Sequence, residues 1–233
     1  MRLSKSKLAT LKNCAYRFKK EVLENYKPKI IGDALIKGLE VHEILDKAFL
    51  VELKEKTIKK EFVKEKIFNN PNYVKHKSDC DNFIKWQSER FMPLYREEKF
   101  FDAELNYSGV VDRVDFNERK ELTLIDYKTG KGKDSIEGYR DELYGYVYLF
   151  EKAHNQEIKR VGILFVTQGK YLEEKVDRNK VVEVVSKIRA ARKEINERIK
   201  TNKWEKTFSP YCKYCSLHLD GVCVDEMHEL NEL

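Results

Sequence analysis

The chain has 233 residues, of which 41% are hydrophobic and 37% are charged, and this length can bury a sizeable core. The longest apolar run, Val161–Val166, falls far short of the roughly 18–20 residues of a membrane-spanning helix, so a helical membrane protein is excluded. A net charge of +6, from 46 basic and 40 acidic residues, permits a nucleic-acid partner without requiring one. The first residues lack the apolar stretch of a signal peptide, so we expect a cytoplasmic protein.

The first hundred residues are expected to be mostly helical. Apolar residues at helical spacing predict four helices, over residues 4–26, 33–53, 55–68 and 78–98. Four apolar residues of the second helix form one stripe: Leu35, Leu39, Leu45 and Phe49. His42 falls on that same stripe and is therefore expected to face the rest of the domain.

After residue 100 the pattern changes to that of strands alternating with helices. We expect a hairpin over 103–116 and 122–127, strands over 160–167 and 170–176, and helices over 136–153 and 181–200. This order predicts an α/β fold, with a mixed central sheet flanked by helices and a helical N-terminal extension. We expect one domain over 1–233: a helical part (1–100), a core (101–200) and a cysteine-bearing segment (201–233) that packs back on residue 14.

The second strand of the hairpin ends in two charged residues on one face. Asp126 and Lys128 lie two residues apart, and side chains two apart on a strand share a face. If the turn is centred on Arg119, Asp112 faces Asp126, with Cβ atoms ~4.5–5.5 Å apart. Opposed carboxylates repel unless a cation lies between them, and carboxylate oxygens suit Mg²⁺ or Mn²⁺. An isolated D-x-K is more often a surface ion pair, but the opposed Asp112 favours a metal site.

Three motifs in order carry a resemblance to a known family. They are Gly38-Leu-Glu-Val-His42, Gly109-Val-Val-Asp112-Arg-Val-Asp115 and Asp126-Tyr-Lys128-Thr-Gly130. They resemble the motifs of the PD-(D/E)XK nuclease superfamily, specifically of its RecB-like branch. The resemblance implies a restriction-endonuclease-like core that hydrolyses phosphodiester bonds. A lone histidine on an apolar face is otherwise more often a core residue.

The resemblance also assigns roles to the residues of these motifs. It implies that Mn²⁺ or Mg²⁺ is bound by His42, Asp112, Asp126 and the carbonyl of Tyr127. It implies that Lys128 positions or activates the attacking water and stabilises the developing charge.

A further family motif, Q-x-x-x-Y, is altered in this chain. The family has glutamine where this sequence has Glu142, four residues before Tyr146. Residues four apart share a helix face, so the pair could contact the substrate or orient Lys128, or Tyr146 could be a core residue. Glu104 has a counterpart in some relatives and is expected to support the site.

The cysteines form a second candidate site. Cys212, Cys215 and Cys223 are spaced C-x₂-C-x₇-C, and Cys14 lies almost 200 residues earlier. Four thiolates could bind Zn²⁺ or a [4Fe–4S] cluster; alternatively, the last three could bind zinc with His218. The arrangement resembles the iron–sulfur subset of RecB-like nucleases, including the Cas4 proteins, which implies a [4Fe–4S] cluster on all four cysteines.

The resemblance implies a metal-dependent exonuclease that degrades single-stranded DNA from a free end, 5′ to 3′, with CRISPR adaptation or recombination proteins as partners. Two alternatives remain: an endonuclease or repair-helicase-associated nuclease with the same site, and a catalytically silent DNA-binding adaptation factor. Basic and aromatic residues predict a substrate path: Lys131, Lys133 and Arg140, then Lys5, Lys7, Lys12 and Arg17, with Tyr127, Tyr139 and Tyr144 for base stacking. The sequence does not indicate an oligomeric state.

Overall fold

A computed structural model describes residues 1–223 except 30–31, 50–59, 89–92, 118, 131, 133 and 211. The strands are β1 (Leu3–Ser4), β2 (Tyr95–Asp102), β3 (Tyr107–Phe116), β4 (Leu122–Lys128), β5 (Ile158–Phe165) and β6 (Lys170–Lys175). The helices are α1 (Lys5–Asn13), α2 (Ala15–Phe18), α3 (Asp33–Lys47), α4 (Lys60–Phe68), α5 (Lys77–Ser88), α6 (Arg140–His154), α7 (Arg178–Thr201) and α8 (Ser216–Leu219). A π-helical turn covers Lys19–Leu23, and 3₁₀ turns cover Glu137–Tyr139 and Cys212–Tyr214.

The six strands form one mixed sheet. Its order is β1-β3-β4-β5-β6, with β2 on the other edge of β3. The β1–β3 and β4–β5 pairs are parallel, and the β2–β3, β3–β4 and β5–β6 pairs are antiparallel. Helix α6 connects β4 to the parallel strand β5, as a crossover between parallel strands requires. The predicted α/β fold with a mixed central sheet is confirmed.

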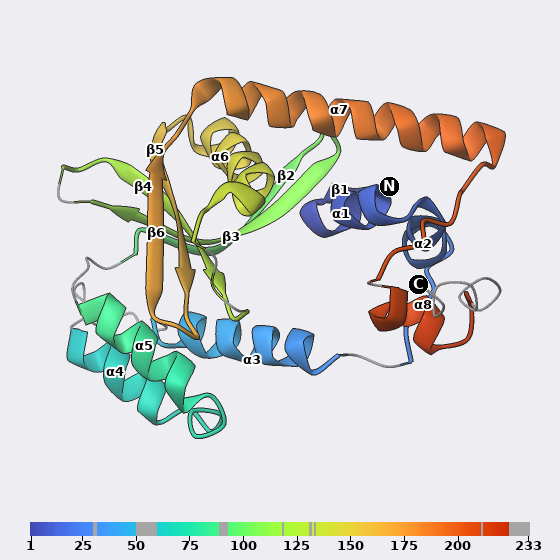
Figure 1. The fold of residues 1–233 in the computed structure, drawn as a ribbon. Coiled ribbons are helices and arrows are strands. Elements are labelled where there is room, and N and C mark those ends of the chain that lie inside the picture. The colour runs from blue at the N-terminus through green and yellow to red at the C-terminus, as the bar shows by residue number, and fades with distance from the viewer. Residues whose placement is uncertain are drawn as a thin grey trace.

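Helices cover both faces of this sheet (Figure 1). Alternate residues of β4 and β5 point to opposite sides, so that Leu124 and Ile163 join one core and Ile125 and Leu164 join the other. The first core lies against α6 and α7 and includes residues of α1 and α2. The second lies against α3, α4 and α5. No helix within the described residues combines the length and the apolar character that crossing a membrane requires.

The N-terminal half differs from its prediction at three points. The first predicted helix breaks at Cys14, whose extended backbone (φ −163°, ψ 113°) ends α1 and begins α2. The helix predicted over 78–98 is wrong at its end, because β2 begins at Tyr95 and its charged residues belong to an edge strand. The stripe on α3 is core only in part, since Leu35 and Leu39 are 59% and 65% exposed. Much of the predicted helix over 55–68 lies outside the described residues.

Candidate active site

The predicted site lies where β3 and β4 separate. Their ladder runs from the Phe116–Leu122 pair to the Arg113–Ile125 pair, a register in which Asp112 and Asp126 come next. The predicted register is therefore confirmed. Beyond this point β4 continues beside β5, and the main-chain N–H of Tyr127 donates to Asp112 Oδ2 at 2.7 Å. Asp112 thus replaces the lost strand partner of Tyr127 with a side-chain oxygen.

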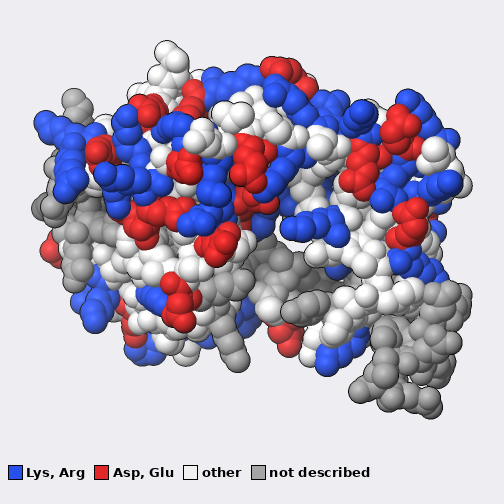
Figure 2. All heavy atoms as spheres, turned by 45° about the horizontal axis from the view of Figure 1, so that its top comes forward, with Lys and Arg blue, Asp and Glu red and all other residues white. Residues whose placement is uncertain are grey.

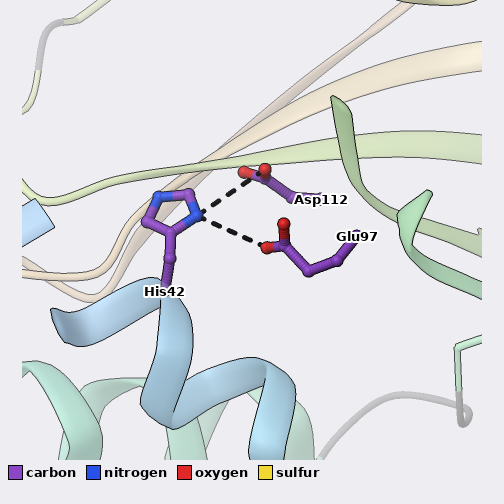
Figure 3. A group of neighbouring side chains, drawn as sticks. All are labelled: His42, Glu97 and Asp112. Carbon is purple, nitrogen blue, oxygen red and sulfur yellow. Dashed lines mark ion pairs between the residues drawn. The ribbon is translucent and has the colours of Figure 1, made fainter. Parts of the chain in front are cut away.

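His42 approaches the separation from α3. Its Nε2 lies 3.2 Å from the carbonyl oxygen of Tyr127. Its Nδ1 lies 3.6 Å from Asp112 Oδ1 and 3.6 Å from Glu97 Oε1, as Figure 3 shows. The structure therefore brings together His42, Asp112 and Tyr127, which the sequence predicted, with Glu97, which it did not.

Glu97 reaches the site from β2, where it lies opposite Asp112. Arg96 pairs with Arg113 and Glu98 pairs with Val111, so the register continues unbroken through Glu97 and Asp112. Its φ of 44° lies in the left-handed region, which non-glycine residues seldom adopt. No sequence signal marks this glutamate, since it sits in a charged run for which the pattern predicts a helix.

These side chains fit a divalent cation. Among the described residues, only His42, Glu97 and Asp112 bring three possible ligand atoms within 4.8 Å of one another. One imidazole nitrogen with carboxylate oxygens and a neighbouring carbonyl suits Mn²⁺ or Mg²⁺, with positions left for water and phosphate. Asp126, also predicted as a ligand, is not part of this group of three.

Asp126 instead faces Lys128, on the side of the separation nearer α6. Asp126 Oδ2 lies 2.5 Å from Lys128 Nζ, which also donates to Glu142 Oε1 at 3.1 Å. Tyr146 OH donates to the same Glu142 oxygen at 3.3 Å, and Lys5 Nζ forms an ion pair with it. The predicted pair on α6, Glu142 and Tyr146, therefore meets Lys128 in one network.

Burial and charge shift the pKa values of these groups. Burial alone would lower the pKa of His42, but Glu97, Asp112 and Asp126 outweigh it and raise the pKa to about 9. Burial, followed by the charge of Asp126, raises the pKa of Asp112 to about 8. Burial alone would lower the pKa of Lys128, but Asp126 and Glu142 outweigh it and raise the pKa of this lysine above its ordinary value. In the absence of a cation, the site therefore holds protons at neutral pH.

A model of the PD-(D/E)XK nuclease superfamily matches residues 2–219 of this chain. The chain belongs to this superfamily. This nuclease resembles a solved structure of a candidate exonuclease from Eubacterium rectale, with a TM-score of 0.53 and 12% sequence identity. That alignment covers 91% of this chain and 87% of the other. At this identity the likeness shows the fold alone.

A second solved structure, of a protein named SSO0001, aligns with the nuclease at a TM-score of 0.35 and 12% identity. The alignment covers 79% of this chain and 95% of that one, and a likeness this low adds nothing to the argument. No curated protein sequence matches the chain significantly. Membership of the superfamily supports nuclease activity on DNA with divalent metals.

The four cysteines of the nuclease line one cavity of about 40 Å³, which His218 also lines. Residues from both ends of the described chain line this cavity. A main-chain hydrogen bond also joins these ends, from the N–H of Tyr16 to the carbonyl of Glu205 at 3.0 Å. These four cysteines, which the sequence predicted to share one site, are Cys14, Cys212, Cys215 and Cys223. That residues 201–233 form a cluster-binding segment stays a prediction.

Several residues predicted for the substrate path lie elsewhere. Glu104 lies in the exposed β2–β3 turn, where it pairs with Lys152 and Arg189, so it does not support the site. The side chains of Tyr127 and Tyr144 are 5% and 1% exposed, which excludes them as stacking surfaces for bases.

The basic residues of the predicted path are also mostly engaged with the protein. Arg140 is held by Glu174, and Arg17 by Glu21. Tyr139 remains close to the site, with Lys128 Nζ 5.6 Å from its ring centroid. Lys131 and Lys133 lie outside the described residues.

Proposed function

We propose that this protein is a Mg²⁺- or Mn²⁺-dependent DNA exonuclease that degrades single-stranded DNA from a free end, 5′ to 3′. One observation carries the proposal. The separation of β3 and β4 brings a nitrogen and carboxylate ligand group, on His42, Glu97 and Asp112, beside the protonated amine of Lys128. The strand preference and the polarity rest on the resemblance to Cas4-like nucleases.

The reaction needs a group that binds the phosphate and a group that holds the attacking water. His42, Glu97 and Asp112 would hold a divalent cation, which would supply Lewis acidity at the phosphate and would lower the pKa of a nearby water. Because the pKa of Lys128 is raised, its amine stays protonated and acts as a donor to phosphate or water rather than as a base. Asp126 and Glu142 hold this amine in place, and Tyr146 positions Glu142 through its hydroxyl.

The proposal is tested on end-labelled linear and circular single-stranded DNA, with Mn²⁺ and with the metal chelated. Lys128→Met keeps the length of the side chain and removes its charge, and we expect a loss in kcat of about 10²–10³. Lys200→Met, at an exposed lysine of α7 outside the predicted substrate path, is the matched control and should be as active as wild type. A Lys128→Met protein as fast as wild type contradicts the mechanism, and cutting of the circular strand favours the endonuclease alternative.

We also propose that the four cysteines bind a [4Fe–4S] cluster. They line one cavity, but within the described residues no three of their sulfurs approach within 4.8 Å of one another. The choice of a cluster over zinc rests on the resemblance to the iron–sulfur subset of RecB-like nucleases. The cluster predicts a brown protein with equimolar iron and sulfide when it is purified without oxygen. Colourless protein containing zinc would favour the alternative site with His218.

The cluster and the substrate suggest a setting. Four cysteines stay reduced and available to a cluster in the cytoplasm, which we propose as the location. By the same resemblance, the expected partners are proteins of CRISPR adaptation or of recombination. Surface charge is compatible with DNA but does not mark its path, because basic and acidic residues are interspersed on the face that carries α7 (Figure 2). Affinity capture from a reducing lysate, with and without single-stranded DNA, tests the partners.

A further inference from the structure

Lys5, the first residue of α1, reaches a carboxylate of the active site. Its Nζ forms an ion pair with Glu142 Oε1, the oxygen that also accepts hydrogen bonds from Lys128 and Tyr146. The side chain of Glu142 is only 6% exposed, whereas that of Lys5 is 40% exposed. A buried carboxylate is therefore held between two amines that lie more than a hundred residues apart in the sequence.

The fold fixes the place of Lys5. Strand β1 pairs in parallel with the start of β3, on the same edge that β4 occupies farther along. The N–H of Leu3 donates to the carbonyl of Asn106 at 2.8 Å, and Ser108 Oγ donates to the carbonyl of Leu3 at 3.1 Å. The Leu3 side chain is buried. Because α1 starts directly after this anchored strand, Lys5 is held beside the separation of β3 and β4.

Lys128 has two carboxylates within reach. Asp126 Oδ2 lies 2.5 Å from its amine and Glu142 Oε1 lies at 3.1 Å. Without a second cation, the buried charge of Glu142 would be balanced by Lys128 alone and would draw it toward α6. A cation at Lys5 shares that charge, and the attraction of Glu142 for Lys128 weakens accordingly.

We infer that Lys5 is a positioning residue for the proposed nuclease reaction, which balances the charge of Glu142 and so keeps Lys128 directed at Asp126 and the substrate phosphate. This inference rests on the proposed function. It also accounts for a departure from the family motif, in which the position of Glu142 is usually glutamine. A glutamine could still accept hydrogen bonds from Lys128 and Tyr146, but it would carry no charge and would need no lysine at position 5.

The inference predicts that the effect of losing Lys5 depends on residue 142. Lys5→Met should lower kcat on linear single-stranded DNA by about tenfold or more while KM changes by less than about twofold. In the Glu142→Gln background the same change should alter kcat by less than about threefold, because the charge that Lys5 balances is gone. Lys5→Arg, which keeps the ion pair, should retain activity. Lys200→Met, an exposed lysine at the end of α7 and outside the predicted substrate path, is the control.

Two results would overturn the inference. Loss of Lys5 that costs the same in both backgrounds would mean that it acts on the DNA directly, and Lys5→Met with wild-type kcat would mean that it has no role. A second readout needs no catalysis: the free energies of unfolding of the four metal-free proteins should show non-additive losses for Lys5→Met and Glu142→Gln. Additive losses would contradict the ion pair itself. Wild-type protein that cleaves no DNA overturns the proposed function, whereas active wild type with uncoupled variants overturns only the role of Lys5.

Discussion

Binding of Mn²⁺ at the proposed site should release protons and strengthen as the pH rises. His42 Nδ1 lies 3.6 Å from Asp112 Oδ1 and from Glu97 Oε1. Although burial alone would lower it, the carboxylates raise the pKa of His42 to about 9, and burial raises the pKa of Asp112 to about 8. Both pKa values lie above 7, so the metal-free site holds at least one proton at pH 7. A cation can bind only after this proton leaves.

The size of the effect follows from proton counting. One displaced proton changes the apparent Kd for Mn²⁺ by about tenfold per pH unit, so the affinity should rise by about 100-fold between pH 6 and pH 8. Because the pKa of His42 is raised to about 9, its proton competes with the metal ion below that pH and not above it. The dependence should therefore flatten above about pH 9, where His42 is already neutral.

Isothermal titration calorimetry with Mn²⁺ measures this directly. Titrations at pH 7 in two buffers with different ionisation enthalpies give the number of protons released, for which we expect one or more. His42→Asn removes the imidazole and should reduce that number and flatten the pH dependence, while Lys200→Met should match wild type. An affinity that is constant from pH 6 to pH 8, or the absence of proton release at pH 7, would refute the reasoning.

Three further predictions concern stability and the packing around the site. Arg113 is fully buried and paired with a buried carboxylate, so Arg113→Met should cost about 3–5 kcal/mol in urea unfolding; a loss below about 1 kcal/mol contradicts this. Burial alone would raise the pKa of Asp102, but hydrogen bonds from Tyr148 and Lys152 lower it below 3.8, the ordinary value for aspartate. Its stabilisation should therefore be present above that pH and fade below it, so the difference in Tm between wild type and Asp102→Asn should shrink from pH 7 to pH 3. In Gly109→Ala the new Cβ would lie 2.6 Å from Tyr146 Cε1, so both Tm and kcat should fall, and an unchanged kcat would show that the position of this tyrosine is unimportant.

The register of the hairpin could be predicted because local residues determine it. Asn117 Oδ1 accepts the main-chain N–H of Arg119 and of Glu121, each at 2.9 Å, which closes the turn around Arg119. Once the turn is centred there, the alternation of side chains leaves one register in which Asp112 and Asp126 come opposite each other. The register of the hairpin and the place of the D-x-K strand could therefore be predicted from a few contiguous residues.

The contacts of Glu97 and Lys5 at the site could not be predicted in the same way, because each depends on strand pairing between separate segments. Glu97 depends on the pairing of β2 with β3, and the charged run around it resembles the exposed face of a helix rather than a strand. Lys5 depends on a two-residue strand that pairs with β3 about a hundred residues later. Cys14 broke the first predicted helix for a similar reason: its sulfur accepts the main-chain N–H of Arg17 at 3.4 Å, a cap that helix periodicity does not show.

The separation of β3 and β4 explains why a buried carboxylate occupies position 112 of the sheet. Where two strands part, each loses main-chain partners, and a buried N–H without a partner is costly. Asp112 meets that need with Oδ2, which accepts the N–H of Tyr127, and it directs Oδ1 toward His42. One carboxylate thus both satisfies the opened sheet and supplies an oxygen to the ligand group, so the defect in the ladder and the proposed chemistry depend on the same side chain.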